Sequence, residues 1–246
     1  MFIYRTPAGK SFIKSIIAGG PSRFGVRDRA EEESHIILQP CTGGLMIWSC
    51  LAMDEKRMED LAKLGEVEWI VVPGEYHRMD CGVWKARFPN AKVVCAADSK
   101  ATIEQVQAVD ATYEEVFAEE ARATTGVRAL IPVEGVRTFY RETHLILDVD
   151  DGCVVLICDQ LFNVKESANA GFMDRLIGSW IFGSIGPLGP TRLGRWVMTK
   201  DKRVASECVS SIPVKAGVPI KAIGVGHGDV ITKGCEEALA AAAKRF

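Results

Sequence analysis

Histidine is scarce in this chain of 246 residues, which has only four. A metal site that needs five imidazoles is therefore excluded. Long apolar runs are also missing, so no segment reaches the length needed to span a bilayer. The chain has no large excess of positive or negative charge, since it contains 30 Lys and Arg and 32 Asp and Glu. This balance gives no reason to expect nucleic acid or a membrane as a partner, and we expect neither.

Paired cysteines of the C-x-x-C type are absent among the eight cysteines of the chain. Most of the cysteines lie in apolar runs such as VVCAA and CVVLIC, where a free thiol behaves as a small hydrophobic group. A chain of this length buries a large core without disulfides, so we expect reduced thiols. The first twenty residues are broken by Pro7, Gly9 and Lys10 before an apolar stretch of signal-peptide length develops. These features predict a cytoplasmic protein.

The chain shows no repeat, low-complexity tract or long linker, which predicts a single domain over residues 1–246. Apolar patterns predict strands at 34–40 and 45–50, joined as a hairpin, at 68–74, 91–96 and 219–225, and on both sides of a turn at 150–152. Helices are expected at 54–65, 81–88, 98–109, 201–212 and 232–245. This order indicates an α/β fold, an αββα sandwich of two mixed β-sheets with helices on the outer faces. A doubly wound α/β sheet is the alternative.

Two polar residues stand where predicted strands end. His227 follows the run IKAIGV and lies between two glycines, which leave its ring accessible and its backbone free to turn. Such a histidine suits a metal ligand or general base, although an ordinary loop histidine is the alternative. Asp159 follows VVLIC, where an unpaired carboxylate is costly, so it needs a cation, a metal or several N–H donors, unless it only caps the next loop. His35 and His144 lie inside predicted strands, and we expect both to be structural.

A third polar group follows the strand at 68–74. Glu75, His77 and Asp80 offer three potential metal ligands within six positions. Turns are polar in general, so a plain turn explains this stretch equally well. Cys81 follows at a predicted helix start, where a thiolate is favoured, and a metal-independent enzyme that uses this thiolate is a further class.

The running order of these features resembles the metallo-β-lactamase superfamily over roughly residues 35–245. The resemblance implies an αββα sandwich that holds one or two ions of zinc, iron or manganese at one edge. Activated water at such a site attacks esters, amides, thioesters or phosphodiesters. Asp159 corresponds to the bridging carboxylate of that family, and His227 corresponds to its last histidine.

The first ligand motif of the family, H-x-H-x-D-H, is not preserved in this chain. Its four ligand positions fall on Gly74, Tyr76, Arg78 and Met79. His77 lies between these positions. A middle histidine is also missing, because Tyr140 stands near its place and His144 fits a neighbouring non-ligand position. The chain therefore resembles a branch of the superfamily with a degenerate metal motif.

Two functions follow from this reduced ligand set. In the first, His77, Asp159 and His227 bind one divalent ion of zinc, iron or manganese. Asp159 or Asp80 then orients the water, and the protein hydrolyses an ester, amide or phosphoester bond in a small molecule. In the second, no metal binds, Arg78 pairs with Asp159, and the protein is a non-catalytic binding or scaffold member of the same fold. Neither function involves an organic cofactor.

The most apolar stretch of the chain is the segment 171–198. Core packing is its simplest role, and a lid over the site or an interface for a homo-oligomer are the alternatives. Arg175, Arg192 and Arg195 within this segment favour an anionic substrate.

Overall fold

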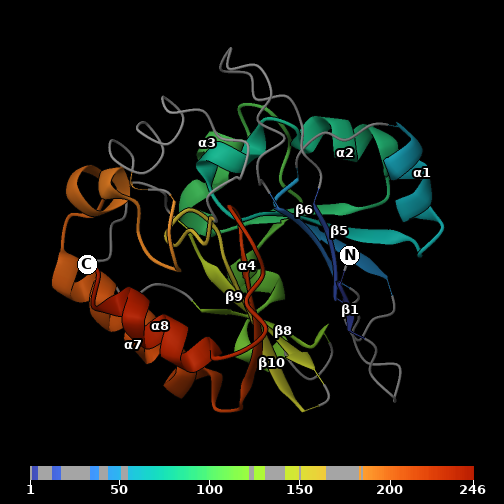
Figure 1. Ribbon diagram of the computed structural model, residues 1–246. Coiled ribbons are helices and arrows are strands. Elements are labelled where there is room, and N and C mark those ends of the chain that lie inside the picture. The colour runs from blue at the N-terminus through green and yellow to red at the C-terminus, as the bar shows by residue number, and fades with distance from the viewer. Residues whose placement is uncertain are drawn as a thin grey trace, which may run out of the picture.

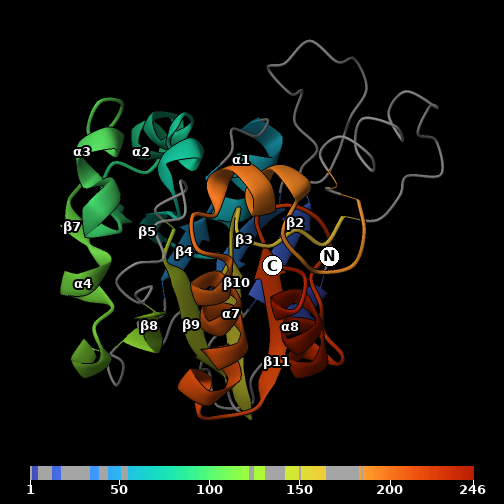
Figure 2. The ribbon, with the colours of Figure 1, turned by 90° about the vertical axis from the view of Figure 1, so that its left-hand side faces the viewer.

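In the computed structural model of the protein, two mixed β-sheets pack face to face, with helices on both outer faces (Figure 1, Figure 2). The structure describes residues 2–4, 13–17, 34–38, 44–50, 55–121, 125–130, 142–149, 151–164, 183 and 185–246. The arrangement is the predicted αββα sandwich, and the doubly wound alternative is wrong.

The first sheet has seven strands, and their order in the sheet follows their order in the chain. They are β1 (Phe2–Tyr4), β2 (Ile13–Ile17), β3 (Ser34–Leu38), β4 (Leu45–Trp48), β5 (Val67–Val72), β6 (Lys92–Cys95) and β7 (Ala111–Thr112). The pairs from β1 to β4 are antiparallel, whereas those from β4 to β7 are parallel. The antiparallel pairing of β3 with β4 confirms the predicted hairpin. β3 lies between β2 and β4.

The second sheet has four strands in the order β11-β10-β9-β8. They are β8 (Val127–Leu130), β9 (His144–Val149), β10 (Gly152–Ile157) and β11 (Ile220–Val225). β8, β9 and β10 are antiparallel neighbours, and β10 pairs with β11 in parallel. The pairing of Gly152 with Val149 confirms the hairpin expected at this turn.

Helices cover both sheets on their outer sides (Figure 2). α1 (Glu55–Ala62), α2 (Cys81–Arg87) and α3 (Lys100–Ile103) pack on the first sheet, α4 (Tyr113–Val116) follows β7, and α7 (Lys202–Ala216) and α8 (Cys235–Ala243) pack on the second sheet. Shorter turns are η1 (Glu75–Arg78), η2 (Ala97–Ser99), η3 (Glu119–Ala121) and the π-helical η5 (Gly194–Met198). None of the helices in the described ranges is both long and apolar enough to cross a membrane.

Three apolar cores separate the four layers, and alternating side chains of each strand supply them. On β10, Val154 and Leu156 face the other sheet, while Val155 and Ile157 face α7 and α8. Successive side chains of a strand point to opposite faces, so a strand buried on both faces reads as a continuous apolar run. This burial explains why VVLIC and WIVV stand out in the sequence, and it fixes where each strand ends.

Two helix predictions differ from the structure because tertiary contacts decide the ends. The helix expected at 98–109 stops at Ile103, and the chain then turns so that Asp110 pairs with β6. The main-chain N–H of Asp110 donates to the carbonyl of Val93 (2.8 Å), and its carboxylate accepts from the N–H of Val93 (2.7 Å). The helix expected to end at Ile212 continues through a proline and ends at Gly217, whose φ of 69° makes it the usual left-handed stop.

Candidate metal centre

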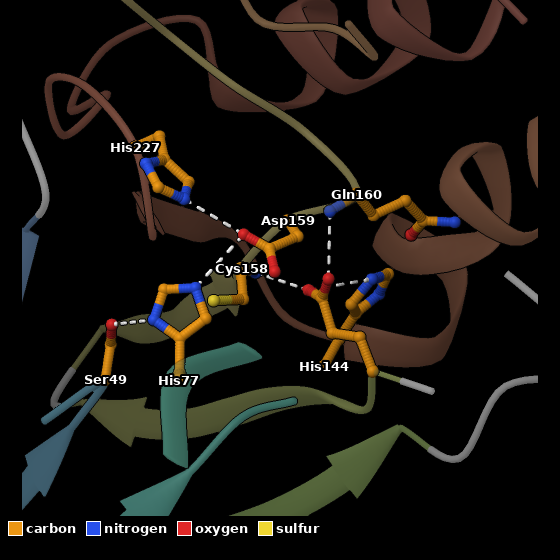
Figure 3. Close-up of polar contacts among 8 residues, drawn as sticks. Ser49, His77, His144, Cys158, Asp159, Gln160 and His227 are labelled. Atoms are coloured by element: carbon orange, nitrogen blue, oxygen red, sulfur yellow. Dashed lines mark hydrogen bonds and ion pairs between the residues drawn. The ribbon is translucent and has the colours of Figure 1, made fainter. Parts of the chain in front are cut away.

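Three turns meet at one edge of the sandwich. η1 follows β5 and carries His77, while Asp159 and His227 each come just after the ends of β10 and β11. Because β10 and β11 are parallel neighbours, their carboxyl ends lie side by side. The three side chains point toward one another (Figure 3), and one potential ligand atom of each lies within 4.8 Å of the other two. The structure thus brings together the three residues expected to bind a metal.

Asp159 is the centre of this group, which we call the His–Asp–His cluster. Its Oδ1 lies 3.1 Å from Nε2 of His77 and 3.0 Å from Nε2 of His227. Burial raises the pKa of the Asp159 carboxyl, but the charge of His77 and the hydrogen bonds from both imidazoles outweigh it and hold the pKa well below its usual range. The buried carboxylate is therefore ionised and has the compensation that its position after VVLIC requires.

His77 is buried, and its ring orientation is fixed from the far side by Ser49. The hydroxyl of Ser49 lies 2.9 Å from Nδ1 of His77. Ser49 follows β4 and has a φ of 61°, a left-handed conformation that is uncommon for serine. Such strain persists where the surroundings enforce it, often at functional sites. In the metal-free protein, Nε2–H of His77 donates to Asp159. With Nδ1–H donating to the Ser49 hydroxyl, Nε2 would bind an ion through its lone pair after releasing this proton, as in the outer partners of metal-binding histidines.

Replacing Ser49 by glycine should weaken metal binding without harming the fold. Glycine adopts a positive φ without strain, so the turn is preserved while the hydroxyl is lost. We expect zinc affinity, measured by competition with a chromogenic chelator, to fall about 10–100-fold, the range seen when outer-shell partners are removed. The control Ser210→Ala removes an exposed hydroxyl on α7 and should leave the affinity unchanged. Equal affinity in Ser49→Gly and wild type would mean that Ser49 does not orient a ligand.

His227 is held by close backbone packing and by a stacked ring. A side chain at Gly226 would put its Cβ 2.8 Å from Sγ of Cys158, and Gly228 has a φ of 107° beside the carbonyl of Asn163. The two glycines therefore let the turn lie directly against the end of β10. The ring of Phe162 stacks on the His227 imidazole, with centroids 4.4 Å apart and planes 3° apart. The His227 side chain is 22% exposed, so the cluster is reached from this side.

A second buried layer lies behind Asp159. The Glu142 carboxylate accepts from the main-chain N–H groups of Cys158 and Gln160, the latter at 2.8 Å. Burial and the nearby charge of Asp159 raise the pKa of Glu142 to about 8. His144 is buried, with its Nε2 3.8 Å from Oε1 of Glu142, and burial lowers its pKa to about 4. His144 is thus structural, as expected, and these groups fix the loop that presents Asp159.

The remaining candidates lie apart from the cluster. Asp80 precedes α2 and is partly exposed, and it is not in the group whose ligand atoms lie within 4.8 Å of one another. The Glu75 carboxylate accepts from the hydroxyl of Thr102 at 3.1 Å. Arg78 donates to the main-chain carbonyl of Glu75, and in the described part of the chain it forms no ion pair with Asp159. The Arg78–Asp159 pair of the metal-free alternative is therefore not formed, because two imidazoles already contact the carboxylate.

Two further expectations concern the Cys81 thiol and the apolar segment 171–198. Cys81 is fully buried, and a hydrogen bond with Cys50 lowers the pKa of its thiol. Complete burial leaves it no access to substrate, which argues against a Cys81 nucleophile. Tyr140 and Arg175 lie outside the described residues, as do residues 171–182 and 184 of the segment 171–198.

Three residues that contact the cluster or its loop were not predicted as part of the site from the sequence: Ser49, Glu142 and Phe162. A weak signal existed for Ser49, because it directly follows a strand whose predicted neighbour leads into His77. Phe162 lies close to Asp159 in the sequence, but nothing there indicates a stack on a distant imidazole. No pattern around Glu142 sets it apart from the other acidic residues of the chain.

The cluster has the donor atoms and spacing that suit a single ion. A tetrahedral ion with each ligand atom at about 2.0–2.1 Å separates those atoms by roughly 3.3 Å. The separations of 3.0 and 3.1 Å from the Asp159 oxygen are close to this value, so a small outward shift makes room. Two imidazoles and one carboxylate with one open side match the ligand set of mononuclear catalytic zinc sites. The residues present therefore fit one ion but not the full dinuclear set.

The sandwich and the position of the cluster define a class: the protein has the metallo-β-lactamase fold. A metallo-β-lactamase from Pontibacter korlensis superposes with a TM-score of 0.59 at 11% identity, over 100% of this chain and 99% of that one. A metallo-β-lactamase from Erythrobacter litoralis superposes with a TM-score of 0.58 at 12% identity, over 99% of this chain and 96% of that one. The mono-zinc form of the metallo-β-lactamase FIM-1 from Pseudomonas aeruginosa has a TM-score of 0.54 at 13% identity, over 99% of this chain and 94% of that one. Neither a family model nor a curated protein sequence matches the chain.

Proposed function

We propose that the protein is a mononuclear metal-dependent hydrolase of an ester, amide or phosphoester bond in a small molecule. The observation that carries this proposal is the His–Asp–His cluster at the edge of the sandwich, with its ligand atoms within 4.8 Å of one another. A fold neighbour that was crystallised in a mono-zinc form supports the idea that one ion suffices on this scaffold.

The side chains around the cluster divide the work of such a site. His77 and His227 would hold the ion through Nε2, and Asp159 would add the negative charge that offsets it. Ser49 holds the ring of His77 in place through Nδ1, and the Phe162 ring holds the plane of His227. When bound, a divalent ion supplies Lewis acidity on the open side of the ligands and eases deprotonation of water.

A non-catalytic, metal-free member of the fold is the second candidate, and one observation favours it. Asp159 accepts hydrogen bonds from both imidazoles, so the buried charge is compensated by protein groups alone. Gly74, Tyr76 and Met79 stand where the family carries further ligands. In that case the edge of the sandwich serves binding and not chemistry.

Metal reconstitution separates the two candidates. The purified protein is stripped with a chelator, reloaded with zinc, iron(II) or manganese, and its metal content is measured by mass spectrometry. We expect about one ion per chain, together with metal-dependent cleavage of a nitrophenyl ester, a nitroanilide or bis-nitrophenyl phosphate. Less than a trace of bound ion and no gain on reloading would contradict the proposal. If Arg78→His then bound metal that the wild type lacks, the metal-free candidate would be favoured.

A further inference from the structure

A pocket of about 460 Å³ lies between η5 and the end of the chain, apart from the His–Asp–His cluster. Its described lining includes four cationic side chains and no acidic one, although the chain as a whole carries a formal net charge of −2. The four cations are Arg192, Arg195, Lys244 and Arg245. Positive charge is therefore concentrated here against the overall balance.

Acidic side chains do not offset three of the four charges of this basic pocket. Among the described residues, Arg195, Lys244 and Arg245 form no ion pair with an Asp or Glu side chain. The pKa of nearby Lys202 is lowered by partial desolvation and by the charge of Arg195. Cations that line one pocket repel one another, and an anion bound among them would relieve this repulsion.

The arginines are held in place by the main chain. Nε of Arg195 donates to a main-chain oxygen of Phe246, the last residue of the sequence, at 2.7 Å, which offsets part of the Arg195 charge. Nη1 of Arg245 donates to the carbonyl of Leu188 at 3.1 Å. Gly189 makes the second contact possible, because a Cβ there would lie 2.7 Å from Cζ of Arg245. These bonds use one nitrogen of each guanidinium, and the planar fork of the other nitrogens matches the oxygens of a phosphoryl group.

The basic pocket is a neighbour of the metal centre. The segment 185–189 forms bridges with 162–164, and on its other side 162–164 pairs with the turn that carries His227. Phe162 exchanges two main-chain hydrogen bonds with Gly189 (2.9 and 3.0 Å) and stacks its ring on His227. One extended segment therefore separates the two sites.

We propose that the basic pocket binds a phosphoryl group that carries at least two negative charges. The proposal goes beyond the hydrolase function and does not require the metal centre to be active. Two sources offer this chemistry: a dissolved organic or inorganic phosphate, and the headgroup of an anionic phospholipid. Leu193, Trp196 and Val197, exposed by 40%, 65% and 73%, lie beside the pocket and make the second source worth testing.

Binding is measured with the full-length, metal-free protein. Pyrophosphate is titrated by calorimetry and by the fluorescence of Trp196, which lines the pocket, with Trp196→Phe to assign the signal. Flotation with phosphatidylcholine vesicles, with and without phosphatidic acid, tests the lipid source. The variant Lys244→Gln/Arg245→Gln removes two charges of the pocket, and the control Lys56→Gln/Lys233→Gln removes two exposed charges elsewhere. Arg195→Lys keeps the charge but removes the planar fork.

We expect the pocket variant to bind pyrophosphate at least about tenfold more weakly than wild type, with Arg195→Lys in between and the control unchanged. Binding only to phosphatidic acid vesicles, lost in the pocket variant, also supports the proposal and assigns the lipid source. No binding to either probe, or equal weakening in the control, overturns it. Arg245 bonds to the main chain, so its loss can lower the stability of the double variant, and the thermal unfolding of each variant is therefore recorded. If the double variant is unstable, the pyrophosphate affinity of Arg195→Lys alone tests the proposal.

Discussion

Asp159→Asn is expected to abolish metal binding at the His–Asp–His cluster and, with it, any metal-dependent hydrolysis. The asparagine amide fills the same volume but carries no negative charge and is a poor ligand for divalent transition metals. Removal of an outer-shell partner already costs about 10–100-fold in affinity, so loss of a direct ligand should cost more than roughly 100-fold. Calorimetric zinc titration of the stripped protein measures this loss directly.

The same substitution has a predictable effect on the metal-free protein. Asp159 accepts two hydrogen bonds as an ionised group, and such bonds are worth more than neutral ones by about 1 kcal/mol each. The free energy of unfolding without metal should therefore fall by about 1–2 kcal/mol, a small change beside the loss of zinc affinity. Asp151→Asn, in the exposed turn between β9 and β10, is the matched control and should change neither quantity. Zinc binding that survives in Asp159→Asn would mean that the ion sits elsewhere.

The layers and the cluster were predictable because both depend on local patterns. Each strand buried on two faces reads as an apolar run, and the residue that ends such a run lies at a sheet edge by geometry alone. His77, Asp159 and His227 all follow such runs. Because the order of the runs matches a known fold, the three residues are predicted to lie at one site, although Asp159 is 82 positions from His77 and 68 positions from His227 along the chain.

The contacts that complete the site depend on pairing between segments and leave no local trace. Ser49 faces His77 only because β4 and β5 are parallel neighbours, and Glu142 reaches the loop after β10 from the segment before β9. The short strand β7 and the end of α3 are set in the same way by contacts with β6. The Arg78–Asp159 pair of the metal-free alternative does not form for a related reason, because Arg78 donates to the main-chain carbonyl of Glu75, three residues away.

Trp84→Ala is expected to produce the largest loss of stability among single substitutions considered for this protein. Trp84 lies on α2, is fully buried, and packs between the helix and the first sheet with Val93 and Ile103 as core neighbours. Truncation of a buried tryptophan leaves a cavity that the rigid sheet cannot close, at a cost of about 3–5 kcal/mol. Since whole domains are stable by about 5–15 kcal/mol, the variant should unfold at a temperature roughly 10 °C lower.

The matched control is Trp196→Ala, which removes the same side chain from a position that is 65% exposed. Its free energy of unfolding should change by less than about 1 kcal/mol. Urea unfolding followed by circular dichroism measures both variants, and Trp84→Leu, with a smaller cavity, provides an intermediate value if Trp84→Ala does not fold. A loss at Trp84 no greater than that at Trp196 would show that α2 is not docked on the sheet. In that event the turn η1, which joins α2 to β5, would not be anchored at both ends, and His77 would not be held against Asp159.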